Sequence, residues 1–423
     1  MSANLMWSRV VGYDAHGPVY QDANGRLLYP PGVGLMNRPQ AAPQVEEQPA
    51  EGTEGAIPVV PFIRASDENL QPGNVDAIRQ LTTAQQDLGV FDITAYGYIR
   101  FLHVLVQATG GTGAGAVGHE DAPWSVLQSI ALTEPNGATI VQFSSGYNMM
   151  LAHKYGGYFP PYSADPRRSR NYSAITGTGG NFAFHLIVPV FINVRDGVGA
   201  LANQDSAGQF KLRVILNSST GIYTTPPATL LPSVRVRAWL AAYDQPPPSS
   251  GGLTNEMEPP GLGTTSFWSE QTGVPVATGD NTIPLKRKGN YLRQVIFVLR
   301  SSGTRAAAET LWPAETRFLR DAFPARYYNN EIWLETMFQR TGFGGIVGAE
   351  ALTNELPGGL DNGVRFHDYM HEFDGGLGRE NRDLWQPSRG STSLEIAGTF
   401  GALTTGTLTI LTNDIAIGEN VFL

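Results

Sequence analysis

The chain of 423 residues contains no cysteine. This absence excludes disulfide bonds, thiol nucleophiles and cysteine-ligated zinc. It also favours synthesis in a reducing cytoplasm, because a secreted protein of this size usually carries some disulfide. Lysine is nearly absent as well, and the formal net charge is −9. A direct, sequence-specific nucleic-acid partner is therefore not expected, since neutralising phosphates requires a basic surface.

Long apolar runs are also missing. No stretch reaches the ~20 apolar residues that a membrane-spanning helix needs. The first residues, MSANLMWSRVVGYD, lack the basic and apolar segments of a signal peptide. We therefore expect neither export nor a membrane span.

Recognisable catalytic and metal-binding motifs are scarce. The segment RFHDYMHEFDGG places His367 and His371 four residues apart. On a helix this spacing would suit zinc, but the HEXXH order is not present. The segment lies among expected strands, where residues i and i+4 stand about 13 Å apart, too far for one ion. His367 and His371 are thus weak metal candidates, and a polar strand or loop is the simpler interpretation.

Other polar groupings have equally plain explanations. His119-Glu120-Asp121 follows the glycine-rich loop GGTGAGAVG, which lacks the lysine of a phosphate-binding P-loop and indicates a flexible surface loop. Glu331 and Glu335 could pair as glycosidase carboxylates, or simply share an exposed strand face. Basic clusters occur at 167–170 and 286–288, where they could meet a neighbouring subunit or lipid phosphates. We predict no catalytic residue and no cofactor.

What the chain does contain is a repeat. Tyr98 to Gly110 reads YIRFLHVLVQATG, and Tyr291 to Gly303 reads YLRQVIFVLRSSG. Each copy is preceded by a short alternating run and followed by a small-residue loop, a Trp and a second strand. These shared flanks favour a duplicated β-module over a chance match.

Composition and turn signals divide the chain into four segments. Residues 1–60 form an extended N-terminal arm with a hairpin expected around Asn24-Gly25. Residues 61–245 form a first β-module, and 246–263 form a Pro/Gly linker beginning with the run QPPPSSGG. Residues 264–423 form a second β-module.

Within both modules the pattern is of short antiparallel strands joined by long loops, which is typical of a jelly-roll sandwich. SVRVRAWLAAYD is a clear case, since Val234, Val236 and Ala238 alternate with Arg235, Arg237 and Trp239. Helices are predicted at 146–158, ended by Gly156-Gly157, and at 309–323. The segment 331–338 is expected to be a strand. The predicted fold class is all-β, with two tandem jelly-roll sandwiches, short inserted helices and an N-terminal arm.

This two-module layout resembles the double jelly-roll major capsid proteins of the tectivirus and adenovirus-hexon lineage. The resemblance covers about 61–423. It is also carried by EDAPWSVLQSIALTEPNGATIVQFSSGYNMMLAHKYGG (120–157), which is similar to the first roll of tectivirus-type phage coat proteins.

The resemblance implies a capsid subunit in the virion, synthesised in the host cytoplasm. Three chains would form a pseudo-hexagonal homotrimer, and the trimers would tile an icosahedral shell over an internal lipid membrane. Partners would be other copies of the chain, a penton or vertex protein and minor capsid proteins. The loops 109–122, 158–181 and 342–363 would form outer towers. The arm would contact the membrane or neighbours through Trp7, Arg9 and Tyr13, residue types suited to an interface.

Two other functions stay open on the sequence. A glycan-binding or glycan-hydrolysing protein can also consist of two jelly rolls, because fold does not fix function. It would need converging carboxylates and usually an export signal. A phage tail or spike protein is the third alternative, and it would be expected to show fibrous repeats or coiled-coil segments, which are not evident.

Overall fold

The computed structural model describes residues 9–14, 17–21, 27–28, 59–192, 196–341, 355–356, 359–370 and 382–418. The chain divides into two compact units, Met1–Ile57 and Pro58–Leu423. In the first unit, β1 (Arg9–Asp14), β2 (Gly17–Gln21) and β3 (Leu27–Leu28) form a small antiparallel sheet. Strands β2 and β3 flank the expected hairpin turn, whose Asn24-Gly25 pair lies outside the described residues.

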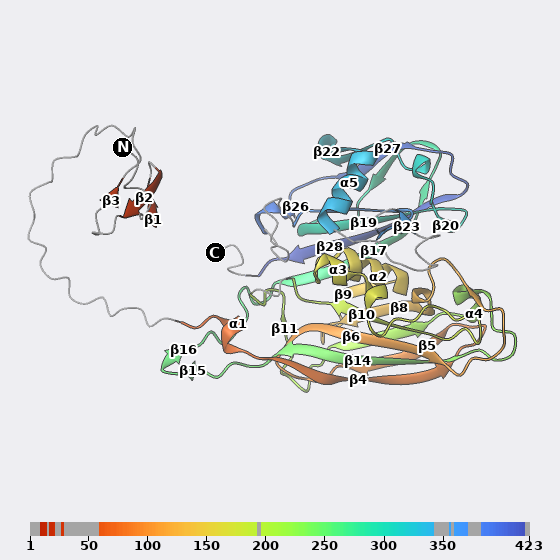
Figure 1. Ribbon diagram of the computed structural model, residues 1–423, viewed down its shortest axis with the longest axis horizontal. Helices are drawn as coiled ribbons and strands as arrows, with labels where there is room; N and C mark the ends of the chain where they lie inside the picture. The colour runs from red at the N-terminus through yellow and green to blue at the C-terminus, as the bar shows by residue number, and fades with distance from the viewer. Residues whose placement is uncertain are drawn as a thin grey trace, which may run out of the picture. The chain divides into compact units, whose positions relative to one another are not determined.

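The second unit begins with an eight-stranded roll (Figure 1). One sheet has the order β10-β6-β14-β4, and the facing strands have the order β9-β8-β12-β5. If the eight strands of the roll are numbered 1 to 8 along the chain, from β4 to β14, these orders are 6-3-8-1 and 5-4-7-2. This is the arrangement of a jelly roll. The strands are β4 (Glu68–Gln80), β5 (Gln86–Asp92), β6 (Tyr98–Thr109), β8 (Leu127–Thr133), β9 (Thr139–Phe143), β10 (Phe182–Pro189), β12 (Lys211–Leu216) and β14 (Ser233–Tyr243).

A second roll repeats this topology. Its strands pair in the orders β25-β19-β28-β17 and β22-β21-β27-β18, which are again 6-3-8-1 and 5-4-7-2. The strands are β17 (Thr265–Val276), β18 (Gly279–Pro284), β19 (Tyr291–Ser301), β21 (Glu315–Arg320), β22 (Phe323–Asn329), β25 (Val364–Asp368), β27 (Leu394–Phe400) and β28 (Gly406–Ala416).

The predicted repeat is therefore a repeat of strand three, since β6 and β19 occupy the same place in the two rolls. Their pairing agrees in detail. Between β6 and β14 the register shifts so that Arg100 is skipped, and between β19 and β28 the same shift skips Arg293. These two arginines coincide when Tyr98 is aligned with Tyr291. A shared bulge at a shared residue type is what duplication of one module would leave.

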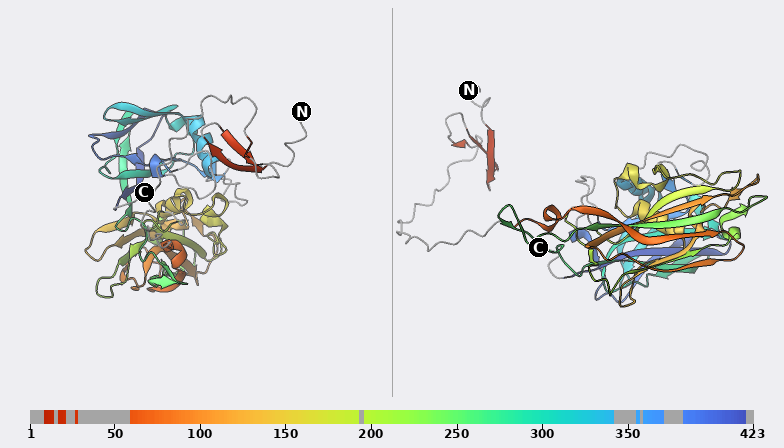
Figure 2. Two further views of the ribbon diagram at one scale, coloured as in Figure 1. Left: turned by 90° about the vertical axis from the view of Figure 1, so that its left-hand side faces the viewer. Right: turned by 90° about the horizontal axis from the view of Figure 1, so that it is seen from below.

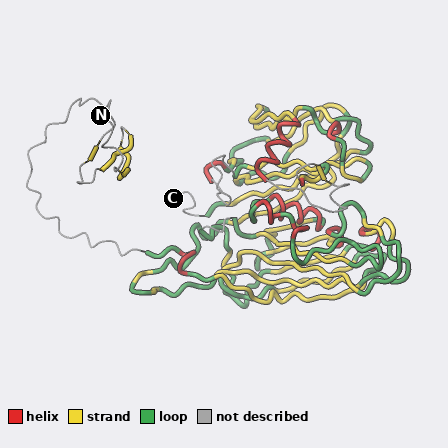
Figure 3. The backbone as a smooth tube through the Cα atoms, viewed as in Figure 1, coloured by secondary structure: helices red, strands yellow, loops and turns green. Residues whose placement is uncertain are grey.

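Shorter elements complete the unit, and Figure 3 shows how few helices accompany the strands. Two helices exceed one turn, α2 (Gly146–Tyr155) and α5 (Asn330–Thr341), among the residues described. The remaining elements are α1 (Phe62–Ala65), β7 (Val117–Gly118), η1 (Trp124–Val126), α3 (Pro161–Ala164), η2 (Pro166–Arg168), β11 (Leu201–Ala202), α4 (Ser219–Ile222), β13 (Tyr223–Thr225), β15 (Ser249–Ser250), β16 (Leu253–Thr254), β20 (Thr304–Arg305), η3 (Glu309–Leu311), β23 (Glu355–Leu356), β24 (Leu360–Asp361), η5 (Arg382–Leu384) and β26 (Gln386–Pro387).

The all-β class with two jelly rolls and short helices is confirmed. The alternation expected in β14 is also present, because Val234 and Val236 are buried whereas Arg235 and Trp239 are exposed. The strands of the two rolls lie between 68 and 243 and between 265 and 416. The exact boundaries at 245/246 and 263/264 stay a prediction. Helix α2 forms where expected, with Ser145 as its N-cap and Gly156 as its C-cap.

Two local predictions are wrong: one expected helix contains strands, and one expected strand is a helix. The segment 309–323, expected to be a helix, contains η3, then β21 and the start of β22. Thr316 and Phe318 are buried two residues apart, so the burial has the period of a strand. The segment 331–338, expected to be a strand, belongs to α5, where Trp333 and Met337 are buried at helical spacing.

Candidate functional site: the junction between the two rolls

The two rolls meet along one continuous sheet. Strand five of the first roll, β9, pairs in parallel with strand one of the second, β17, through Val141 and Trp268. Trp268 is 1% exposed, and its indole Nε1 donates a hydrogen bond to the Tyr158 hydroxyl at 2.8 Å. Its ring also lies 5.9 Å from that of Phe143 in the first roll. Trp268 is thus as fully buried at the junction as a residue of a domain core.

Helix α2 fills the space beside this seam, and Figures 1 and 2 show it between the rolls. Every residue of α2 is buried. The last carbonyl groups of a helix lack partners within it, and here the second roll supplies them. Gln294 donates to the Tyr155 carbonyl at 2.7 Å, and Arg293 donates to the Gly156 carbonyl at 2.9 Å. A cation at the helix C-terminus is also favoured by the helix dipole.

A buried lysine on α2 contacts a further segment of the second roll. Lys154 Nζ donates to the Gly359 carbonyl at 2.6 Å and to Asp361 Oδ2 at 2.7 Å, and it lies 3.2 Å from Asp165 Oδ2. The Tyr155 hydroxyl also donates to Asp361 at 2.7 Å. Asp361 lies on β24, so one carboxylate of the second roll receives two side chains of the first. Arg167 also belongs to this group, because its guanidinium donates one hydrogen bond to each carboxylate oxygen of Asp165.

A second set of ion pairs continues this network toward the loop ahead of η1. Glu120 and Asp121 both contact Arg300 of β19, and Glu120 Oε1 lies 2.9 Å from its Nη1. Arg305 lies 3.1 Å from Asp121 and donates to the Tyr147 hydroxyl of α2 at 2.8 Å. The segment predicted to be a flexible surface loop therefore joins the rolls, and that interpretation of Glu120 and Asp121 is wrong.

Charges of both signs meet in this network. Among the described residues it joins four cationic side chains to four carboxylates: Lys154, Arg167, Arg300 and Arg305 with Glu120, Asp121, Asp165 and Asp361. Burial alone would raise the pKa of Asp361, but Lys154, Arg167 and Arg305 outweigh it and hold that pKa below its usual value. Asp165 behaves alike, because Lys154 and Arg167 overcome the burial that would raise its pKa.

Such a network constrains geometry more than it adds stability. Replacing a buried ion pair by apolar residues is often neutral, whereas removing one partner leaves an uncompensated charge. The observed packing of the two rolls brings these eight charged groups together. If the rolls were displaced relative to one another, buried charged groups would lose their partners. These ion pairs connect the two β-modules directly.

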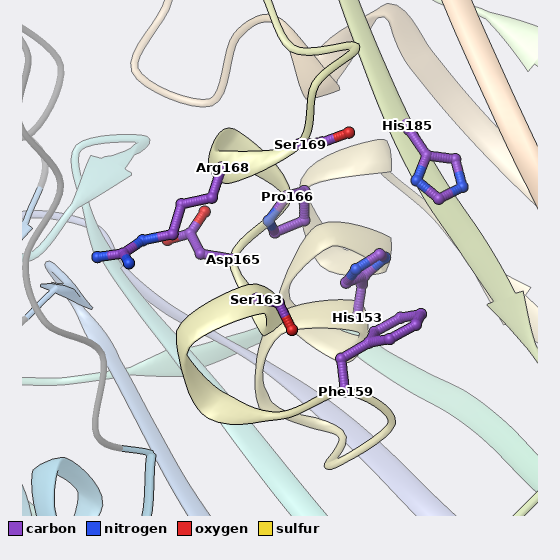
Figure 4. A pocket seen from close by; sticks show the side chains of 8 residues that line it. All are labelled: His153, Phe159, Ser163, Asp165, Pro166, Arg168, Ser169 and His185. Atoms are coloured by element: carbon purple, nitrogen blue, oxygen red, sulfur yellow. The ribbon is translucent and has the colours of Figure 1, made fainter. Parts of the chain in front are cut away.

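A pocket of about 240 Å³ lies beside this network, between the outer side of β10 and the α3–η2 segment. Figure 4 shows the imidazoles of His153 and His185 on one side of it, with Arg168 extending away from them. His185 Nε2 lies 2.7 Å from His103 Nδ1, and His153 Nδ1 accepts from the Ile187 amide at 3.3 Å. Burial is the main cause that lowers the pKa of His153 to about 3 and that of His185 to about 4.

The residues singled out from the sequence lie elsewhere. His367 is buried in β25 with its Nδ1 3.0 Å from the Tyr328 hydroxyl, and burial lowers its pKa to about 3. His371 lies outside the described residues, within which no group of metal-ligating side chains gathers. Glu331 and Glu335 stand one turn apart on α5 rather than on a strand.

Of the arm residues, Arg9 and Tyr13 lie on β1, and Trp7 falls outside the described residues. Of the proposed tower loops, 109–122 and 158–181 are described and meet where Gly179 N donates to Gly113 O at 2.7 Å. Most of 342–363 is outside the described residues. No helix in the described part of the chain is long and apolar enough to cross a membrane.

Comparisons with known proteins agree with this architecture. No family model matches the sequence, and no curated protein sequence matches it. Solved structures do. The major capsid protein (MCP) of STIV aligns with a TM-score of 0.55 at 12% identity, covering 84% of this chain and 98% of that one. Vp54 of PBCV-1 aligns at 0.54 and 12%, covering 83% and 94%.

A chain in the structure of Sulfolobus Turreted Icosahedral Virus aligns at 0.53 and 10%, covering 84% and 92%. The fold of this chain is therefore that of the double jelly-roll major capsid proteins. The alignments extend over nearly the whole of each viral chain, so both rolls take part.

Proposed function

We propose that the chain is a viral major capsid protein of the tectivirus-like type, encoded by a bacteriophage. The proposal rests on the pair of rolls, which have the same strand order and belong to one compact unit. Solved capsid proteins with this fold align with more than four fifths of the chain. A capsid tile needs two such modules at a fixed angle. The ion pairs across the buried junction support that requirement.

Three copies would form a homotrimer whose six rolls make a pseudo-hexagonal tile, and tiles would close an icosahedral shell. Cyclic closure satisfies point-group symmetry, and permanent interfaces of this kind bury over ~2,000 Å². The role is structural rather than enzymatic. Within the described residues, the carboxylates and imidazoles of the junction are committed to ion pairs and packing.

The arm 1–60 would link neighbours or touch an internal membrane through Trp7, Arg9 and Tyr13. A penton or vertex protein and minor capsid proteins would complete the virion. The chain would be made in the host cytoplasm before assembly, where its net charge of −9 keeps it dispersed.

The test is the size and outline of the purified protein. Light scattering coupled to size exclusion should give a species of three times the 45.6 kDa chain mass that resists dilution. Negative-stain images should then show hexagonal outlines. A stable monomer that binds carbohydrate on a glycan array would overturn the proposal and favour the glycan-active alternative.

A further inference from the structure

A small cavity lies inside the junction between the two rolls. Its volume is about 30 Å³, and both rolls line it, with Glu120 and Tyr147 from the first and Arg305 and Asp361 from the second. A cavity of about 10–15 Å³ already admits one water molecule, provided that the water finds two to four polar partners. The volume therefore suits one small ligand, and the polar groups of the wall decide which ligand it is.

The Tyr147 hydroxyl is a hydrogen-bond donor that needs an acceptor. Its oxygen accepts from Arg305 Nη1 at 2.8 Å, so the O–H group itself remains to be satisfied. In the described part of the chain this O–H group has no acceptor, and Tyr147 is only 1% exposed to solvent. Burial raises the pKa of the phenol well above its usual value, so the proton stays in place at neutral pH. A buried donor without an acceptor is costly.

Two carboxylate oxygens of the same cavity wall need donors. Asp361 Oδ2 accepts two hydrogen bonds, whereas its Oδ1 lies 3.9 Å from Arg305 Nη1, beyond hydrogen-bond length. Glu120 Oε1 accepts from Arg300 and from the Arg305 amide, whereas its Oε2 lies 3.9 Å from Arg305 Nε. Within the described residues neither Asp361 Oδ1 nor Glu120 Oε2 accepts a hydrogen bond. One donor and two acceptors therefore meet at this cavity.

This set of groups selects water rather than an ion. An anion could accept from Tyr147, but it would meet the carboxylates of Glu120 and Asp361. A cation would meet the guanidinium groups of Arg167 and Arg305, which also line the cavity, and it would leave the Tyr147 O–H group without an acceptor. A water molecule accepts from the hydroxyl and donates to both carboxylates at once, so it satisfies all three groups.

We propose that the junction binds one water molecule as a structural ligand, held by the Tyr147 hydroxyl, Asp361 Oδ1 and Glu120 Oε2. Three partners is the usual number for a buried water. Tyr147 lies on α2 of the first roll and Asp361 on β24 of the second, so the water joins side chains of the two rolls that make no direct hydrogen bond with each other. The inference concerns the junction within one chain and does not depend on the capsid proposal.

High-resolution crystallography of the whole chain tests the site. The map should show one density peak within hydrogen-bond distance of the Tyr147 hydroxyl, Asp361 Oδ1 and Glu120 Oε2. Crystals soaked in rubidium bromide distinguish water from an ion, because rubidium and bromide both scatter anomalously and water does not. An anomalous peak in the cavity would overturn the proposal. A Tyr147 hydroxyl that donates directly to Asp361, with no density between them, would overturn it as well.

Tyr147→Phe removes the donor and keeps the ring. The density peak should be lost from crystals of this variant. The matched control is Tyr223→Phe, which removes a buried hydroxyl that donates directly to the Gly180 carbonyl at 2.7 Å, and it should leave the peak unchanged. A fall in melting temperature alone would not identify the water, because Tyr147→Phe also removes the acceptor of Arg305. A peak that keeps its place and height in Tyr147→Phe would contradict the proposal.

Magnetic relaxation dispersion of the water nuclei gives the same answer in solution, because it counts water molecules that stay long in a protein. The wild-type chain and Tyr223→Phe should give the same count, and Tyr147→Phe should give one fewer. Equal counts in all three proteins would overturn the proposal. The wild-type crystal decides the question even if Tyr147→Phe fails to fold.

Discussion

Acid should destabilise this protein through histidines that are buried in their neutral form. Burial lowers the pKa of His367 and of His153 to about 3, against about 6.5 in an unfolded chain. Between these values the unfolded chain binds protons that the folded chain does not. Stability is therefore fully present above about pH 6.5 and is lost as the pH falls toward 3.

The magnitude follows from the size of the shift. Each pKa unit corresponds to about 1.36 kcal/mol, so lowering the pH from 6.5 to 5 should cost about 2 kcal/mol for each histidine. Two histidines would remove about 4 kcal/mol, a large share of a typical stability of about 5–15 kcal/mol. Urea denaturation followed by tryptophan fluorescence at several pH values measures this loss.

His367→Phe isolates one contribution, since it keeps an aromatic ring beside Tyr328 and Phe318. The variant's stability at pH 7 can differ from wild type, but its loss between pH 6.5 and 5 should be smaller by about 2 kcal/mol. His119→Gln, on an exposed loop, serves as the control for removal of a histidine. If His367→Phe lost as much stability between pH 6.5 and 5 as wild type, His367 would not contribute to the acid sensitivity.

Three further predictions concern the junction, the outer loops and the arm. Lys154→Met should destabilise the protein by about 3–5 kcal/mol because Asp361 and Asp165 both lose the ammonium group that contacts them. A double-mutant cycle with Asp361→Asn should show coupling, and additive effects would contradict this. Gly111→Ala should lower the melting temperature, because its new Cβ would lie 1.9 Å from the Gly179 carbonyl, whereas Gly177→Ala meets nothing within 4 Å and should be neutral. Deleting 1–60 should impair shell assembly in electron micrographs while trimers still form, and normal particles would contradict this.

Secondary structure could be predicted from the sequence where the signal lies within a few neighbouring residues. The alternation of Val234 and Val236 with Arg235 predicts the strand β14 as it is observed. Helix α2 is likewise preceded by a capping serine and followed by two glycines. The error at α5 was avoidable in part, because Trp333 and Met337 have the spacing of one buried helical face.

The junction itself could not be predicted in this way. Lys154 and Asp361 are separated by 207 residues, and their contact depends on how two complete rolls pack. Glu120 looked like a loop carboxylate because its partner, Arg300, belongs to the other roll, 180 residues away. Long-range charge pairing leaves no periodic signal in a single sequence, and only the fold shows it.

Single-particle electron microscopy of the purified protein would show whether three chains assemble as a capsid subunit does. We expect a ring of three chains and six rolls. A monomer, or a dimer related by a two-fold axis through one shared face, would contradict it.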